Sequence, residues 1–106
     1  MKIFISQPMR GKTDAEILAE REKAIKVAKA RFGDDVEVLE SFFQGAPVEA
    51  KPLWFLGESL KVMADADVVL FCEGWEENRG CQVECVAAVN YDIPVYKMPR
   101  DKGAHQ

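Results

Sequence analysis

A strand, a loop and a helix follow one another in the stretch Val68-Val69-Leu70-Phe71-Cys72, Glu73-Gly74-Trp75-Glu76-Glu77-Asn78 and Arg79-Gly80-Cys81-Gln82-Val83-Glu84. The first part is uniformly apolar, as strands of a buried parallel sheet are. The second part is polar, and Gly80 is expected to turn the backbone tightly before a helix over 81–91. A strand that leads through a short loop into a helix is the repeating unit of an α/β sheet.

The rest of the chain repeats this alternation. Short apolar strands are predicted at 2–6, 36–39 and 93–96, with a helix in each interval. Strands that alternate with helices need parallel crossovers, which are almost always right-handed. The sequence therefore predicts a small doubly wound parallel α/β sheet, Rossmann-like or flavodoxin-like, with four or five strands and helices on both faces.

Local signals bound two of the helices. Thr13 and Glu16 form a capping box at the start of the first, which Gly33 ends, and Pro52 suits the first position of the second. The apolar face expected for the first comprises Ile17, Arg21, Ala24, Ile25, Ala28 and Phe32. The face expected for the second comprises Leu53, Leu56, Leu60 and Met63.

Size and charge restrict the class of protein. The 106 residues suffice for one domain, which we place at 1–98, with a flexible polar tail at 99–106. A net charge of −4 argues against a nucleic-acid-binding surface. No apolar run reaches the roughly 20 residues of a membrane span, and no signal peptide precedes the first strand. We expect a cytoplasmic protein with no membrane association.

The cysteines do not predict a metal site. Cys72, Cys81 and Cys85 form no Cys-x-x-Cys pair, and the single His105 lies in the tail. Structural zinc sites usually contain such a pair, so buried or partly buried free thiols are expected instead. We expect neither a metal nor a cofactor.

The loop after the first strand has features of an anion site. It comprises Ser6, Gln7, Pro8, Met9, Arg10, Gly11, Lys12 and Thr13. Backbone N–H groups ahead of a helix, with two basic side chains, suit a phosphate or a sugar hydroxyl. A P-loop is disfavoured because Ser6 stands where its first glycine belongs. An ordinary solvated loop fits the residues as well.

Glu84 is the candidate nucleophile. We expect it in the first turn of its helix, at the carboxyl edge of the sheet where α/β proteins bind ligands. There the helix dipole would keep the carboxylate ionised. The alternative is an ordinary helix-opening carboxylate without a chemical role.

The loop before this helix offers acids and an aromatic ring. Glu73, Glu76 and Glu77 are candidates to raise the pKa of Glu84 or to act as general acid, or else form a solvated surface. Trp75 is a candidate to stack on a flat heterocycle, as are Phe42 and Phe43. A core or interface role suits each aromatic residue equally.

Together these features resemble the nucleoside 2-deoxyribosyltransferase-like family, which includes the 2'-deoxynucleoside 5'-phosphate N-hydrolases. The resemblance covers nearly the whole chain. It rests on residues 3–11, on Ala66-Asp67-Val68-Val69, on Gly80 four residues before Glu84, and on Ile93-Pro94-Val95-Tyr96. The chain most resembles the small phage- and prophage-associated members.

The resemblance implies cleavage or base exchange of an N-glycosidic bond. Glu84 would attack the anomeric carbon, and water or a second base would resolve the glycosyl-enzyme. The Arg10-Gly11 loop resembles one that holds a 5'-phosphate, which favours a nucleoside monophosphate. The implied substrate-binding residues are Ser6, Gln7, Pro8, Met9, Arg10, Gly11, Ser59, Gly74, Trp75, Asn78 and Gly80.

Two positions depart from the family pattern. Ser59 replaces a base-positioning Asp, and Asn78 replaces an Asp of the transferase branch and cannot supply a proton. Glu58, Glu73 and Glu76 are candidates to substitute as the acid. Asp65 and Asp67, at the amino end of their strand, are expected to be structural.

Three functions remain open at this stage. The first is the enzyme, the second a non-catalytic nucleotide-binding module of the same fold, and the third an accessory interaction protein. We also expect a homodimer or a higher homo-oligomer. Phe42, Phe43 and Trp54 offer apolar surface to cover, and the resemblance implies that a neighbouring subunit closes the pocket.

Overall fold

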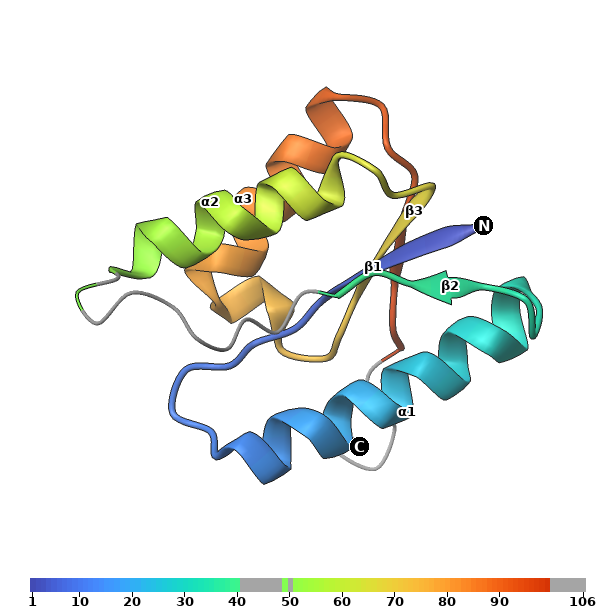
Figure 1. Cartoon of the computed structure of the whole chain (residues 1–106), viewed down its shortest axis with the longest axis horizontal. Helices are drawn as coiled ribbons and strands as arrows, with labels where there is room; N and C mark the ends of the chain where they lie inside the picture. The colour runs from blue at the N-terminus through green and yellow to red at the C-terminus, as the bar shows by residue number, and fades with distance from the viewer. Residues whose placement is uncertain (41–48, 50, 100–106) are drawn as a thin grey trace.

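A computed structural model of the chain describes residues 1–40, 49 and 51–99. Four parallel strands form one sheet in the order β2-β1-β3-β4 (Figure 1). The strands are β1 Lys2–Ser6, β2 Glu37–Val38, β3 Val68–Phe71 and β4 Val95–Lys97. The helices are α1 Asp14–Phe32, α2 Pro52–Met63 and α3 Arg79–Asn90, with a 3-10 turn, η1, at Trp75–Glu77. The doubly wound α/β fold is confirmed.

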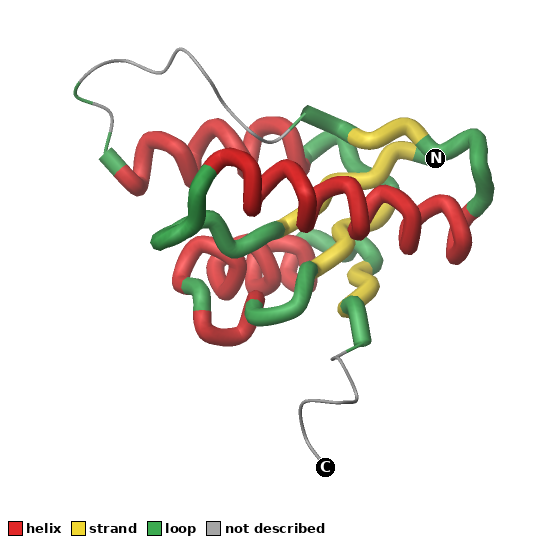
Figure 2. The backbone as a smooth tube through the Cα atoms, turned by 90° about the horizontal axis from the view of Figure 1, so that it is seen from below, coloured by secondary structure: helices red, strands yellow, loops and turns green. Residues whose placement is uncertain are grey.

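The strand order explains where the helices lie. The chain moves from β1 outward to β2, then reverses, passes β1 and continues through β3 to β4. Crossovers of one hand then place α1 on one face of the sheet and α2 and α3 on the other. Figure 1 shows this arrangement, and Figure 2 shows it from below, with α1 crossing in front of the strands. The reversal makes the carboxyl ends of β1 and β3 the expected place for a ligand.

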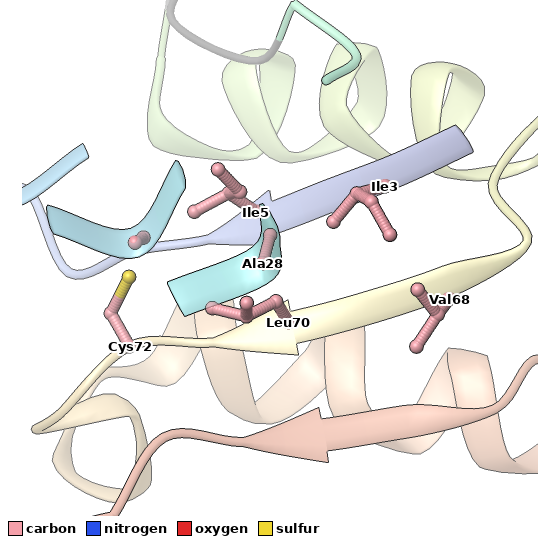
Figure 3. Packing of buried hydrophobic residues seen from close by; sticks show 7 residues of the cluster. Ile3, Ile5, Ala28, Val68, Leu70 and Cys72 are labelled. Carbon is pink, nitrogen blue, oxygen red and sulfur yellow. The ribbon is translucent and has the colours of Figure 1, made fainter. Parts of the chain in front are cut away.

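Alternation along the two central strands divides the core. Ile3, Ile5, Val68 and Leu70 face α1, where Ala24 and Ala28 allow the helix to approach closely (Figure 3). Phe4, Val69 and Phe71 face the other way and pack with Met63, Cys81 and Ala88 of α2 and α3. Each side chain of β1 therefore faces either α1 or the α2–α3 side of the sheet, and Ser6, at the end of β1, is on the same side as Phe4.

The face predicted for α1 is largely confirmed. Ile17, Arg21, Ala24 and Ala28 are buried, and Ile25 and Phe32 are partly buried against the same cluster. Its capping box is present, since Glu16 N–H donates to the Thr13 hydroxyl and Thr13 N–H donates to the Glu16 carboxylate.

The face predicted for α2 is wrong at its beginning. Met63 is buried and Leu60 packs partly on the core, but Leu53 is 75% exposed. Apolar residues occur all around the first turns of this helix, so periodicity alone could not select the inner side.

The predicted role of Gly80 is also wrong. It is the second residue of α3, which begins at Arg79 rather than Cys81. The tight turn is made earlier by Gly74, whose φ is 90°. Such a φ favours glycine because a Cβ would be strained there.

Asp67 has the structural role that was expected. Its carboxylate accepts a hydrogen bond of 2.7 Å from the backbone N–H of Lys2, which ties the starts of β3 and β1 together. The predictions for Phe42, Phe43, His105 and nearly all of the tail lie outside the described residues. Across the described ranges, no helix is long and apolar enough to cross a membrane.

Candidate functional site

An open cleft of about 1360 Å³ lies at the carboxyl ends of β1 and β3. Its walls come from the loops that follow these strands and from the first turns of α2 and α3. Nine residues predicted for the site line it: Gln7, Pro8, Met9, Arg10, Ser59, Gly74, Asn78, Gly80 and Glu84. The fold thus brings together residues up to 77 positions apart in the chain (84 minus 7).

Glu84 reaches the cleft from the buried side of α3. Cys81, Glu84 and Ala88 are spaced by three and four residues, which puts them on the helix face that packs on the sheet. Glu84 is only 7% exposed, although the cleft opens beside it. It is the sixth residue of α3 and not, as expected, a first-turn residue.

The Glu84 carboxylate is held by a buried hydroxyl group. Ser6 Oγ donates to Glu84 Oε1 over 2.6 Å. Ser6 can do so because it lies on the same face of β1 as Phe4, toward α3. The Ser59 side chain of α2 also favours the charged form of the carboxylate and lowers its pKa.

Burial decides the protonation of this carboxylate. Removal from water raises the pKa of Glu84, and the hydrogen bonds from Ser6 and Ser59 oppose the rise without cancelling it. The helix dipole does not govern the pKa of Glu84, because the residue lies beyond the first turn, where the dipole acts. The neighbouring acidic loop does not cause the rise either.

Two side chains of the loop after β1, one near each end of the loop, bind to α1. Gln7 Nε2 donates to the Ile17 carbonyl oxygen over 2.7 Å. Lys12 Nζ forms an ion pair with Glu20 at 2.8 Å, so most of its charge is compensated within the chain. Arg10 is exposed at the cleft and Gly11 has a φ of 80°. Both basic residues predicted for an anion line the cleft, where Lys12 is paired with Glu20 and Arg10 is exposed.

Three predicted substrate-binding residues do not line the cleft. Ser6 lies beneath it and contacts Glu84. Gly11 lies outside the lining, and Trp75 packs elsewhere. The Trp75 ring is 5.1 Å from the Phe71 ring and carries Lys97 Nζ at 4.9 Å over its face. The core role weighed for Trp75 therefore fits its position better than stacking on a ligand.

Asn78 and Ser59 depart from the family pattern and have defined partners. The Asn78 side-chain oxygen accepts from Cys81 N–H over 2.9 Å and caps α3. Ser59 lines the cleft and lowers the pKa of Glu84.

Of the glutamates considered as a general acid, only some line the cleft. Glu73 and Glu77 line the cleft. Glu58 pairs with Lys61 at 2.9 Å, and neither it nor Glu76 is part of the lining. An acid that acts on a ligand in this cleft would come from the loop after β3.

The sequence reasoning missed one wall of the cleft. Pro52, Leu53, Phe55 and Leu56 supply an apolar side from α2, and Lys51 and Arg79 add cationic groups at the mouth. The sequence signal that could have predicted this wall is Pro52, which marks the start of α2. The apolar residues that follow Pro52 lie in the first turns of α2 and line the cleft with the loop after β1.

The thiols of Cys72 and Cys81 are neutral near pH 7. Burial raises the pKa of Cys72 to about 12 and that of Cys81 to about 11. Within the part of the chain that the structure describes, no three His, Cys, Asp or Glu side chains are grouped so that they could hold a metal ion.

Comparison of the chain with models of known protein families, with curated proteins and with solved structures gives no match. A functional assignment therefore depends on what the cleft itself can bind and do.

Proposed function

We propose that the protein cleaves or exchanges the N-glycosidic bond of a (deoxy)nucleoside or its 5'-monophosphate, with Glu84 as the nucleophile. The observation that carries the proposal is the Glu84 carboxylate itself. It is buried, held by Ser6, and set in the wall of a cleft at the reversal point of the sheet. A carboxylate held in this way is suited to attack a carbon from one direction.

The chemistry divides one difficult substitution into two. A Glu84 carboxylate oxygen forms an ester bond to the anomeric carbon while the bond to the base nitrogen breaks and its electron pair leaves with the base. Glu73 or Glu77 is placed to give the departing base a proton. Water then attacks the anomeric carbon and yields the free sugar, or a second base attacks and yields a new nucleoside.

The lining of the cleft fits such a substrate. Leu53, Phe55 and Leu56 offer an apolar surface for the flat base. Arg10 and Arg79 lie at the cleft with charges that suit a 5'-phosphate. Binding pockets for small ligands are commonly about 300–1,000 Å³, so the volume admits a nucleotide with room for water or a second base.

A second candidate is a nucleotide-binding module without turnover. The raised pKa of Glu84 favours it, because burial opposes the ionised form that a nucleophile requires. Asn78 favours it too, since its side-chain oxygen caps α3 and its amide carries no acid proton.

The test is release of free base from a panel of deoxynucleosides, ribonucleosides and their 5'-monophosphates, with and without an acceptor base. We expect release by the native chain and a loss of at least about 1,000-fold in Glu84→Gln, because the covalent route is removed. The matched control is Glu22→Gln, an exposed carboxylate on α1 that should leave the rate unchanged.

Two results would replace this proposal. Nucleotide binding by calorimetry with no release of base would favour the binding module. Release that survives Glu84→Gln would remove Glu84 from the chemistry.

A further inference from the structure

We propose that Ser6 and Ser59 are positioning residues that hold the Glu84 carboxylate in one orientation, an inference that rests on the nucleophilic role proposed for Glu84. The two serines come from separate elements, β1 and α2, while Glu84 comes from α3. Both hydroxyls act on one carboxylate at the inner wall of the cleft: Ser6 Oγ donates to it over 2.6 Å, and Ser59 lowers its pKa.

Ser6 is fixed by the sheet rather than by a ligand. It is the last residue of β1, is 1% exposed and pairs in register with Phe71 of β3. Its hydroxyl makes a hydrogen bond of 2.6 Å to Glu84 Oε1, short for such a bond and typical of an ionised acceptor. Ser6 does not line the cleft, so it can act on a substrate only through Glu84.

Ser59 approaches the same carboxylate from the opposite helix of the layer. It is half-buried on α2 and lines the cleft, at the position where the resemblance implied a residue that binds the base. Its hydrogen bond goes to Glu84 instead. The serine thus supports the nucleophile where an aspartate would repel it.

Besides the two serines, Cys81 and the charged residues of the cleft lie around the Glu84 carboxylate. The Cys81 thiol on α3 lies within hydrogen-bonding contact of Ser6 and stays protonated. The other charged residues that line the cleft are Arg10, Lys12, Lys51, Glu73, Glu77 and Arg79. Glu84 is governed by burial and by the two hydroxyls, so the serines are the groups whose removal should change its titration.

The direct test is titration of the Glu84 side-chain carboxyl by carbon-13 NMR in the whole chain, with the resonance assigned from Glu84→Gln. Both serines donate to the charged form, so Ser6→Ala and Ser59→Ala should each raise the pKa of Glu84, and the double variant should raise it most. The matched controls are Ile3→Val, three residues away on the opposite face of β1, and Gly57→Ala, two residues from Ser59 on α2. Neither control should move the pKa of Glu84.

Two variants keep the test decisive. If Ser6→Ala fails to fold because β1 is central, Ser59→Ala carries the measurement from a half-buried helix position. An unchanged Glu84 titration in the folded serine variants overturns the inference.

Kinetics provide the second readout. With base release as the assay, each variant should lower kcat about 10- to 100-fold and move the acidic limb of the rate profile to higher pH. For Ser6→Ala, KM should stay within about twofold, since a residue outside the cleft removes no substrate contact. Equal changes in the serine variants and in the controls would indicate a merely structural role.

The two readouts separate the two proposals. A shifted titration in a chain that releases no base supports the positioning role of the serines and removes the enzymatic function. Base release with an unshifted titration supports the function and removes the positioning role.

Discussion

Glu84 shows how a single side chain can oppose the stability of the fold that holds it. Burial penalises its charged form, and two serine hydrogen bonds recover only part of that penalty. The charged form of Glu84 is thus unfavourable in the folded chain, as is common for catalytic carboxylates.

The pH dependence of stability follows from the raised pKa of Glu84. The native chain holds the proton to higher pH than the unfolded chain, whose glutamates titrate near about 4.3. Its contribution to stability is therefore complete below that value and is lost as the pH rises through the native pKa. Glu84→Gln cannot titrate, and its amide oxygen can still accept from Ser6.

We expect Glu84→Gln to gain stability relative to the native chain as the pH rises from 4 to 8. Urea unfolding of both chains across this range measures the difference. The exposed Glu22→Gln variant should show no such trend. A difference that does not change with pH would contradict the raised pKa of Glu84.

The sequence was sufficient to predict which residues lie at the site, but not their burial or their hydrogen bonds. The order of strand, loop and helix suffices to place Glu84 and the loop from Gln7 to Arg10 at one edge of the sheet. The burial of Glu84 and its bond to Ser6 join positions 78 apart in sequence, so no local pattern encodes them. The same holds for the contact between Trp75 and Phe71, which depends on how η1 packs.

At the scale of elements, the accuracy of prediction follows the clarity of the periodic pattern. The α1 face is correct because polar residues separate its buried positions, including Ala24 and Ala28. In α2 the apolar residues surround the first turns, and the cleft leaves part of them exposed. The tight turn was predicted at Gly80, but it is made by Gly74. In the sequence, a glycine that turns the chain before a helix cannot be distinguished from one that lies in the first turn of the helix.

Two glycines allow a direct test of this distinction. Gly74 adopts a φ of 90°, and a Cβ there would meet Pro8 at 3.8 Å, so an alanine fits in space but not in conformation. We expect Gly74→Ala to cost about 1–2 kcal/mol of unfolding free energy. Gly57 lies inside α2 with open space around its Cβ, and Gly57→Ala should add about 0.5–1 kcal/mol.

Chemical denaturation of the two single variants measures both effects. If Gly74→Ala matched or exceeded the native chain in stability, the left-handed turn ahead of η1 would have to be withdrawn.

For the whole molecule, the outer surface of the α2–α3 layer carries several exposed apolar side chains. Val83, Val86 and Val89 recur every third residue on the exposed side of α3, and Leu53 and Trp54 are exposed on α2. An apolar surface of this extent is characteristic of a protein contact. We keep the prediction of a homodimer or a higher homo-oligomer.

Analytical ultracentrifugation tests this prediction. We expect the native chain to sediment as an oligomer and Val86→Glu to shift toward the monomer, because a charge would be buried at the contact. Lys26→Glu, a change of charge on the exposed side of α1, should leave the sedimentation unchanged. A native chain that remains monomeric up to millimolar concentration would rule out the oligomer.

The pairing of β1 with β3 also determines when the protein can fold during its synthesis. Ile3 lies opposite Val68 and Ser6 opposite Phe71, so the first strand to leave the ribosome waits for about two thirds of the chain before its inner neighbour exists. Until then Ile3, Phe4 and Ile5 are exposed with only the short β2 to pair with. Because pairings this distant in sequence form late, these apolar residues stay exposed to association with other chains until β3 is made.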